Sequence, residues 1–460
     1  MSTVSIDDNH SEKKGHPKAL YLLFFTEMWE RFSYYGMRGI LILYLTKSYF
    51  EGGLAIDEKD ASLIYGFFTG FVYFTPLIGG WLADQYIGQR KAITIGGITM
   101  MLGQFTLFAL NTHTGLYMGL LLLIIGNGFF KPNISTLVGR LYSDNDPRRD
   151  AAFSIFYMGI NLGAFLAPLA IGYFSDGIFA TRDAAGKIIT YGYKYGFLIS
   201  GIGMLLGQLL FNGLAQKYLK DIGRYPATKK DESEGAVEVK PVTKEDRQRH
   251  IVIFTLTAFV VFFWAGFEQA GSSLSLYTDK YINRVVLGFE IPTAWFQSVN
   301  PLFIVALAPL FAVFWTSKLG KKLSTPIKMG LGMILLGIGF FFMLAAVAER
   351  GGNVEDVNIK ASLVWLVMTY LLHTIGELCL SPVGLSVVTK LSHPKFASLM
   401  MGVWLLASFL ANIIGGFVAS VVESLGASTI FATIAGFVIG LGLIMILLNK
   451  QILKLMHGIR

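Results

Sequence analysis

The sequence predicts an all-α integral membrane protein with about twelve transmembrane helices arranged in two six-helix bundles. The chain has 460 residues, of which 53% are hydrophobic and only 15% are charged, whereas about a quarter of the residues in a soluble domain are charged. Apolar runs of about 20 residues, the length that crosses a bilayer, recur along the chain. A polar, charged stretch near the middle separates six such runs from six more.

The apolar runs define the expected organisation. A cytoplasmic tail over 1–20 precedes an N-terminal bundle over 21–216, and a cytoplasmic linker over 217–249 leads to a C-terminal bundle over 250–449 and a cytoplasmic C-terminus over 450–460. The expected spans lie near 21–46, 60–85, 92–111, 115–138, 152–175, 195–216, 250–276, 292–316, 327–348, 361–389, 397–421 and 428–449.

Basic residues predict the orientation. Of the 38 Lys and Arg residues, 26 lie in segments on the side of the membrane that holds both chain ends, and 9 lie in the loops on the other side. Short loops rich in Lys and Arg stay in the cytoplasm. We therefore expect a multi-pass protein of the cell (cytoplasmic) membrane with both ends inside.

Composition also argues against several functions. The net charge of +8 comes from loop residues rather than from a basic surface module, which argues against nucleic acid as a partner. The single cysteine, Cys379, allows neither a disulfide within the chain nor a thiolate metal cluster. The spans contain neither HExxH nor opposed Asp residues, so we do not expect an enzyme. No cofactor besides a coupling proton, and no obligatory protein partner, is predicted.

The two halves repeat each other at a spacing of 250 residues, which indicates a duplicated transporter fold. Residues of the expected fourth span match residues of the expected tenth span. The matching pairs are Gly126 with Gly376, Pro132 with Pro382, Arg140 with Lys390, and Leu141 with Leu391.

Ionisable residues inside the spans point to a polar interior. Each costs about 2.5–3.5 kcal/mol at a helix centre, so together they must face water or one another. They are Glu27, Glu30, Arg31, Arg38, Lys131, Glu268 and Glu377. On the first span, a stripe runs along one helical face and is expected to line a cavity. It contains Glu27, Glu30, Arg31, Tyr34, Tyr35 and Arg38.

Helical rise predicts two pairs of charges that join the halves. Arg38 and Glu268 lie about 26 and 27 Å from the inner ends of their spans, and Lys131 and Glu377 each lie about 24 Å from the outer ends. We expect an outer gating pair, Arg38 with Glu268, and an inner gating pair, Lys131 with Glu377. Closing them alternately would expose a central site to each side in turn.

Several motifs resemble a known family. The sequence from Glu27 to Gly36, EMWERFSYYG, resembles the ExxERFxYYG motif of the proton-dependent oligopeptide transporter (POT/PTR) family. FYMGINLG at 156–163, GFFKPN at 128–133 and FEQAGSS at 267–273 are similar to other patterns of that family. The loop GWLADQYIGQRK at 80–91 resembles the loop motif of the major facilitator superfamily, to which that family belongs.

The resemblance implies a proton-coupled symporter that imports di- and tripeptides by alternating access. It implies that a proton-coupling group contains Glu27, Glu30, Arg31, Lys131 and Glu268. It implies that Arg38 receives the peptide carboxylate and Glu377 the peptide amino terminus. The rest of the expected peptide site is Tyr34, Tyr35, Tyr73, Lys131, Asn161, Trp264, Asn300, Trp404 and Ser408. The expected partners are therefore short peptides, protons and the lipid bilayer.

Other functions fit the sequence less well. Another proton-coupled carrier of the superfamily, such as a drug exporter or a nitrate carrier, is the main alternative. A membrane-embedded enzyme lacks a catalytic motif. A channel or receptor does not need paired charges on both sides of a central site.

Overall fold

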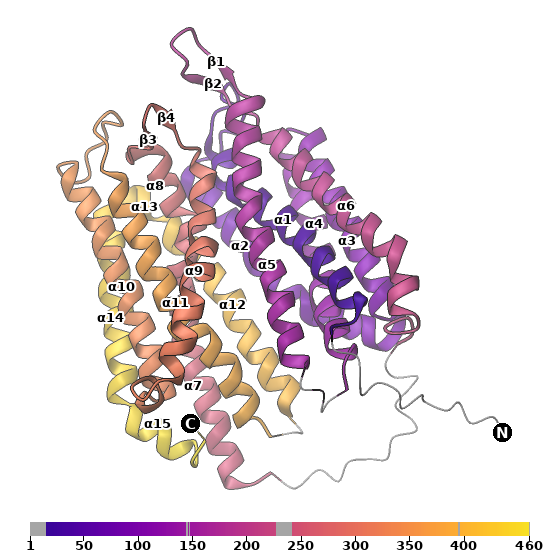
Figure 1. Cartoon of the computed structure of the whole chain (residues 1–460). Helices are drawn as coiled ribbons and strands as arrows, with labels where there is room; N and C mark the ends of the chain where they lie inside the picture. Colours follow the sequence, from indigo (N-terminus) through magenta and orange to yellow (C-terminus); the bar gives the residue numbers. More distant parts are fainter. Residues whose placement is uncertain (1–14, 144–145, 147, 227–241, 394–395, 460) are drawn as a thin grey trace.

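The computed structural model describes residues 15–143, 146, 148–226, 242–393 and 396–459; most of the expected N-terminal tail lies outside the described residues. Two helical bundles stand side by side (Figure 1). The first contains α1 (Lys18–Thr46), α2 (Glu58–Leu82), α3 (Gln89–Ala109), α4 (His113–Arg140), α5 (Arg149–Gly172) and α6 (Tyr193–Leu219). The second contains α7 (Lys244–Phe267), α8 (Ser273–Tyr281), α9 (Val299–Thr316), α10 (Thr325–Glu349), α11 (Leu363–Leu391), α12 (Ala397–Ser420), α13 (Val422–Leu425), α14 (Ala427–Leu447) and α15 (Asn449–Leu455).

These helices confirm the predicted all-α membrane fold. Within the described residues, 11 helices are long and apolar enough to cross a membrane. α1 has 29 residues, which is also long enough to cross a membrane, although it carries Glu27, Glu30, Arg31 and Arg38. The helices α6 and α7 extend into both ends of the predicted linker, and residues 227–241 of that linker lie outside the described residues.

The internal repeat appears in the packing of equivalent helices. α4 begins at His113 and α11 at Leu363, 250 residues later. A Cβ atom on Gly126 would lie 2.6 Å from the carbonyl oxygen of Gly96 in α3. A Cβ atom on Gly376 would lie 2.7 Å from the carbonyl oxygen of Gly332 in α10. Each half therefore uses a glycine pair at the same place to bring two helices into close contact.

The predicted span 250–276 is not one continuous helix. α7 ends at Phe267, a 3₁₀ segment covers Glu268–Gly271, and α8 follows from Ser273. Two side chains donate hydrogen bonds to the carbonyl oxygen of Ala270, which lies at the break. Gln297 Nε2 lies 2.5 Å from this oxygen and Ser275 Oγ lies 2.9 Å from it. A break at membrane depth is tolerated where such partners exist, and here it places Glu268 at the bend.

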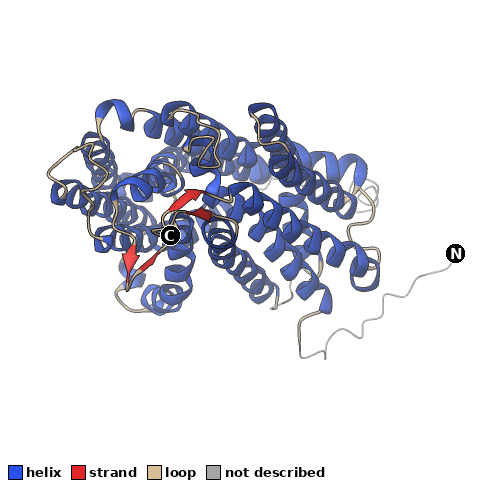
Figure 2. Ribbon diagram, turned by 90° about the horizontal axis from the view of Figure 1, so that it is seen from above, coloured by secondary structure: helices blue, strands red, loops and turns tan. Residues whose placement is uncertain are grey.

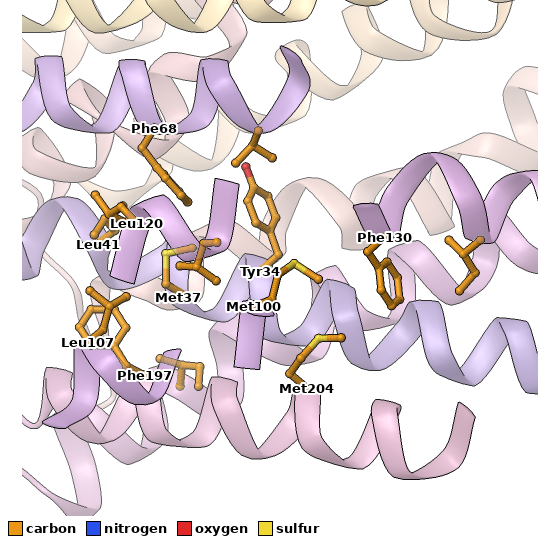
Figure 3. Packing of buried hydrophobic residues seen from close by; sticks show 14 of the residues in the cluster. Tyr34, Met37, Leu41, Phe68, Met100, Leu107, Leu120, Phe130, Phe197 and Met204 are labelled. Carbon is orange, nitrogen blue, oxygen red and sulfur yellow. The ribbon is translucent and has the colours of Figure 1, made fainter. Parts of the chain in front are cut away.

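Each bundle has its own hydrophobic core. Figure 3 shows part of the first, in which Met37 and Leu41 of α1 pack with residues such as Phe68, Leu107 and Phe197 from neighbouring helices. A second cluster, which includes Phe340 and Phe431, fills the other bundle. Separate cores allow the two bundles to move against each other without being unpacked.

The predicted superfamily loop joins helix ends of the first bundle. Gln89 Nε2 donates to Asp84 Oδ1 at 2.6 Å, and Arg140 Nη1 at the end of α4 donates to Gln89 Oε1 at 2.9 Å. Arg90 Nη1 donates to the carbonyl oxygen of Lys220, just beyond α6, at 2.5 Å. The loop thus connects the ends of α2, α3, α4 and α6.

Two short hairpins lie at the opposite end of the molecule from α15 (Figure 1). Strand β1 (Thr181–Arg182) pairs with β2 (Ile188–Thr190), and β3 (Val285–Val286) pairs with β4 (Phe289–Glu290). Figure 2 shows both hairpins, in red, over the helix ends. Both fall in loops predicted to face outside, so we refer to this end as the outer end and to the end with α15 as the inner end.

Candidate substrate chamber

A cavity of about 190 Å³ lies between the two bundles. Polar side chains from both halves line it together with apolar and aromatic ones. The lining residues are Tyr35, Arg38, Tyr73, Tyr157, Ile160, Asn161, Ala164, Trp264, Phe267, Glu268, Ala270, Gln297, Asn300, Pro301, Ile304, Tyr370, His373 and Glu377. We call this cavity the chamber.

The structure brings Arg38 and Glu268 together, as their predicted depths require. Arg38 Nη2 forms an ion pair with Glu268 Oε2 across the two halves, and Arg38 Nε donates to Tyr65 Oη at 2.7 Å. Both charged side chains are 11% exposed, which is enough for contact with a ligand in the chamber. Both residues line the chamber, so a ligand carboxylate there would compete with Glu268 for Arg38.

Glu377 occupies the other half of the chamber lining. Its Oε2 accepts a hydrogen bond from Asn300 Nδ2 at 2.9 Å, and the same amide lies 3.0 Å from Thr374 Oγ1. Asn300 thus fixes one carboxylate oxygen, and among the described residues Glu377 has no ion pair with a base. A base on one wall and an acid on the other suit a ligand with opposite charges at its two ends.

The predicted inner pair is not formed in this conformation. No ion pair joins Lys131 to Glu377 in the part of the chain that the structure describes. Lys131 Nζ lies 4.2 Å from the centroid of the Tyr73 ring, an arrangement that stabilises a cation. The structure therefore combines a closed outer pair with separated inner partners, and the role of the inner pair stays a prediction.

The first part of the charged stripe on α1 forms a buried cluster instead of lining the chamber. Arg31 Nε lies 2.8 Å from Glu27 Oε1 and 2.7 Å from Glu30 Oε2. Asn127 Nδ2 donates to Glu30 Oε1 at 3.3 Å. The three charged residues are at most 3% exposed, and two carboxylates share one guanidinium. Lys131 also interacts electrostatically with Glu30 and Glu27, so the two carboxylates face two bases.

The remaining predicted peptide-site residues divide into two groups. Five line the chamber beside Arg38 and Glu377: Tyr35, Tyr73, Asn161, Trp264 and Asn300. Four lie outside its lining: Tyr34, Lys131, Trp404 and Ser408. Tyr34 packs in the N-terminal core and Trp404 in the C-terminal core, so contact between these side chains and a ligand would require a different conformation.

Several lining residues were not predicted from the sequence. Tyr157 belongs to the FYMGINLG segment and lies one helical turn before Asn161, which was a usable signal. Gln297 and Tyr370 are isolated polar residues in apolar surroundings, and no spacing identifies them. His373 lies one turn before Glu377; it is 2% exposed, and its ring centroid lies 4.8 Å from that of Phe340.

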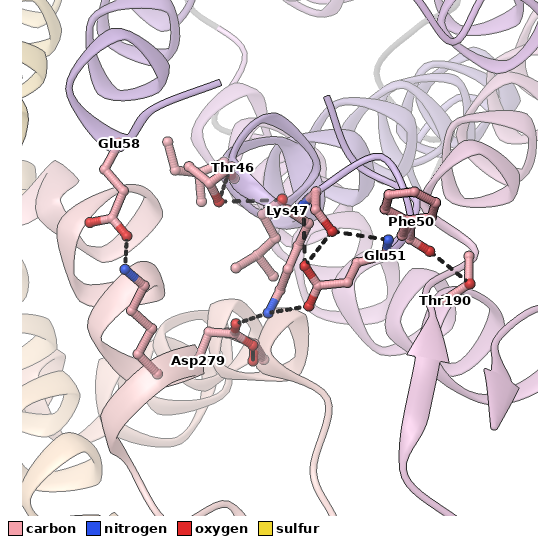
Figure 4. A network of polar contacts seen from close by, with 12 residues as sticks. Thr46, Lys47, Phe50, Glu51, Glu58, Thr190 and Asp279 are labelled. Atoms are coloured by element: carbon pink, nitrogen blue, oxygen red, sulfur yellow. Dashed lines mark hydrogen bonds and ion pairs between the residues drawn. The ribbon is translucent and has the colours of Figure 1, made fainter. Parts of the chain in front are cut away.

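A further group of ion pairs closes the outer end (Figure 4). Lys47 Nζ, just after α1, lies 2.7 Å from Asp279 Oδ2 in α8, and Glu58 of α2 pairs with Lys280 of α8. Burial acts to lower the pKa of Lys47, but the Asp279 carboxylate outweighs it and the pKa is raised. Lys47 therefore stays protonated, and both pairs join the N-terminal to the C-terminal half.

Close helix packing supports the same closure. A Cβ atom on Gly66 of α2 would lie 2.6 Å from Gly416 Cα in α12. Trp295 Nε1 donates to the carbonyl oxygen of Leu169 at 2.9 Å, and Ser298 Oγ donates to that of Phe165 at 2.7 Å. These contacts join α2 to α12 and α5 to the segment before α9.

Two duplicated helical bundles around a central polar chamber are the architecture of a membrane transporter. The sequence matches the family model for the POT family over residues 90–224 and 228–434. The chain belongs to the POT family.

Relatives extend over nearly the whole chain. It is 37% identical to "Uncharacterized transporter YclF" of Bacillus subtilis, with 97% of this chain and 96% of the relative covered. It is 36% identical to "Peptide transporter YePEPT" of Yersinia enterocolitica, with 96% of each covered. It is 31% identical to a "Di-/tripeptide transporter" of Lactococcus lactis, with 98% and 99% covered.

Solved structures agree with this assignment. A crystal structure of peptide transporter POT in complex with sulfate has a TM-score of 0.86 at 36% identity, with 97% of each chain covered. A POT family transporter in complex with 5-aminolevulinic acid has a TM-score of 0.85 at 30% identity, with 96% of this chain and 98% of that chain covered. These similarities confirm the predicted fold and family.

Proposed function

We propose that this protein is a proton-coupled symporter that imports di- and tripeptides by alternating access. One observation carries the proposal: Arg38 and Glu377, from different halves, line the same chamber. Short peptides share a positive end, a negative end and an amide backbone. A chamber with a base, an acid and amide-bonding side chains recognises these common features whatever the side chains are.

In this proposal, Arg38 binds the peptide carboxylate and Glu377 binds the amino terminus. Asn161, Asn300 and the tyrosines bond the backbone, and Trp264 contributes to an apolar wall. The chamber volume of about 190 Å³ is below the 300–1,000 Å³ typical of sites for drug-sized ligands. Small peptides are therefore the favoured class, and larger ones require the chamber to widen.

Proton coupling is assigned to Glu268, to the buried cluster of Glu27, Glu30 and Arg31, and to Lys131 of the GFFKPN motif, which interacts electrostatically with Glu30. A carboxylate paired with arginine stays ionised, and its protonation releases the arginine. Protonation of Glu268 would free Arg38 for the peptide carboxylate and open the outer pair. One charge that crosses about 100 mV supplies roughly 2.3 kcal/mol, or about fiftyfold accumulation.

The proposed location is the cell membrane, with both chain ends in the cytoplasm. The lysine- and arginine-rich segments then lie inside, and the hairpins and the closed ion pairs lie outside. In this orientation, the ion pairs of Lys47 with Asp279 and of Glu58 with Lys280 support a state whose chamber is closed to the outside.

Uptake into liposomes tests the function. Purified protein should accumulate a labelled dipeptide when the outside is acidic, and unlabelled tripeptides should compete. Accumulation should vanish when a protonophore collapses the gradient. Uptake of nitrate or export of a cationic drug without peptide transport would contradict the proposal and support the other carrier functions.

A further inference from the structure

A second pocket, with a volume of about 530 Å³, lies at the inner end of the C-terminal bundle. Four of its lining residues are lysines: Lys321, Lys322, Lys328 and Lys390. They come from three places in the fold, namely the 3₁₀ segment before α10, the first turn of α10 and the last turn of α11. The lining contains no acidic residue, and among the described residues none of the four lysines has an ion pair. The pocket therefore concentrates positive charge without an internal counter-ion.

Neutral hydrogen-bond donors face the same pocket. The N-cap residue of the 25-residue helix α10 is Ser324, whose side chain does not cap the helix. The Ser324 hydroxyl donates instead to Asn449 Oδ1 at 2.5 Å. Pro326 in the first turn has no N–H, and the N–H of Lys328 bonds to the carbonyl oxygen of Ser324. The N–H groups of Thr325 and Ile327 remain open to an anion, which the helix dipole favours there.

An independent observation comes from Trp315 at the end of α9. Its indole Nε1, a donor, is buried and has no hydrogen-bond partner, although Trp315 lines the pocket. Lys328 Nζ lies 4.7 Å from the centroid of the Trp315 ring. A buried donor without a partner is costly unless a bound group accepts from it. The indole N–H, the ammonium groups and the open N–H groups at the start of α10 are all donors, and an anionic oxygen group suits such a set.

We propose that this pocket binds the phosphate group of an anionic lipid in the cytoplasmic leaflet. The pocket lies at the boundary between two spans, since α9 ends at Thr316 and α10 starts at Thr325. Basic pockets between transmembrane helices on the cytoplasmic side suit anionic headgroups. Ile327, Val387 and Leu453 also line the pocket and offer apolar contacts for the glycerol and acyl part of a lipid. The assignment to this leaflet rests on the orientation in the proposed function.

A bound phosphate would connect the α9–α10 loop to the inner end of α11. Lys390 lies 13 residues after Glu377 on α11, or about 20 Å along the helix. The pocket lies outside the chamber, but one of its lysines belongs to α11, the helix that contributes Glu377 to the chamber.

Lipid-dependent thermal stability tests the proposal. Wild-type protein in phosphatidylcholine nanodiscs should gain stability when phosphatidylglycerol is added. The variant with Lys321→Gln, Lys322→Gln, Lys328→Gln and Lys390→Gln should lose this gain. The matched control changes four exposed lysines at the same end, Lys244→Gln, Lys318→Gln, Lys450→Gln and Lys454→Gln, and alters net charge equally. The control should keep the gain.

Single substitutions and soluble probes complete the test. Each single Lys→Gln change in the pocket should weaken the apparent phosphatidylglycerol affinity about fivefold, and this measurement remains informative if the fourfold variant is unstable. Inorganic phosphate and glycerol 1-phosphate, added in detergent, distinguish a soluble phosphate ester from a lipid as the source. A gain that persists in the pocket variant, or no gain with any of these probes, would overturn the proposal. Loss of peptide uptake with an unchanged lipid effect would instead contradict only the proposed function.

Discussion

The outer and inner ends of the chamber differ in how the two halves meet. At the outer end Arg38 pairs with Glu268 and Lys47 pairs with Asp279, so each half supplies one partner of each pair. Towards the inner end Lys131 lies over Tyr73 and Glu377 accepts from Asn300, each within its own half. Ion pairs between the halves are thus formed at the outer end, whereas Lys131 and Glu377 remain apart towards the inner end. This asymmetry is what a single state of an alternating-access cycle requires.

The largest effect is expected in the buried cluster of Glu27, Glu30 and Arg31. A substitution there tests whether these charged residues of α1 stabilise the fold. Arg31→Met removes the one base that Glu27 and Glu30 share. Breaking a buried pair on one side costs about 3–5 kcal/mol, so thermal unfolding in detergent should shift strongly downward. Replacing Glu27 and Glu30 by Gln in the same chain should restore much of the loss. Full stability of Arg31→Met alone would show that the cluster does not need its base.

Glu268→Gln tests the outer pair directly. The variant cannot release a proton at this position, so the accumulation of dipeptide should fall from about fiftyfold at 100 mV to about onefold. Counterflow exchange without a gradient should persist, because exchange needs no net proton movement. In wild type, uptake should rise as the outside pH falls, and this dependence should flatten in Glu268→Gln. Glu355→Gln, at an exposed position, is the control and should behave as wild type.

The two walls of the chamber should recognise opposite ends of the ligand. A hydrogen bond to a charged group contributes about 1.5–3 kcal/mol, so Arg38→Gln and Glu377→Gln should each weaken dipeptide binding about 10- to 100-fold. Arg38→Gln should stop discriminating against dipeptides with an amidated carboxyl end. Glu377→Gln should stop discriminating against N-acetylated dipeptides. The reverse pattern in competition assays would exchange the two assignments.

Outer closure also depends on the contact between Gly66 and Gly416. Gly66→Leu overfills this contact, at a typical cost of 1–3 kcal/mol. The outer end should open more often, and labelling of a cysteine placed near the outer chamber should speed up by about 5- to 100-fold. The control is Gly440→Leu, where an added Cβ has no neighbour within 4 Å. An unchanged labelling rate in Gly66→Leu would show that the contact between Gly66 and Gly416 does not contribute to closure.

The smallest effect is expected at the rim. Lys47→Gln breaks the pair with Asp279, but the carboxylate keeps a second base, Arg284 Nη2 at 3.6 Å, so the expected loss is about 1 kcal/mol or less. The same labelling assay should show at most a fivefold change. Lys47→Arg, which keeps the charge, should behave as wild type. A change in Lys47→Arg as large as that in Lys47→Gln, with Lys59→Gln unchanged as control, would show that the charge pair does not contribute to closure.

The sequence was sufficient to predict the helices and the outer pair. Apolar length and charge counts do not depend on tertiary detail, and helical rise placed Arg38 and Glu268 at one depth. The break at Glu268 was missed because hydropathy averages over a turn, although Gly271 and the two serines after it were a signal. Tyr34 was placed correctly on the charged stripe but packs in the core. At about 100° per residue the stripe is about 140° wide, so it extends beyond the part of α1 that faces the chamber.

Trp404 and Ser408 show a second limit. Their expected place at the peptide site came from family resemblance, yet they lie outside the chamber lining in this state. A conformational change moves helix faces relative to a cavity, and a sequence motif does not specify the state. Gln297 and Tyr370 show the converse, because a lone polar residue in an apolar run gives no direction toward the chamber.

Distance measurements between spin labels at both ends test the central claim most directly. The buried native Cys379 is first replaced by Ala. One label pair at Ser135 and Ser386 reports the inner end, and another at Lys187 and Leu287 reports the outer end, all at exposed positions. With dipeptide at acidic pH in nanodiscs, we predict that the outer distance increases in the molecules whose inner distance decreases. Distances that change together, or remain fixed under all conditions, would contradict alternating access through this chamber.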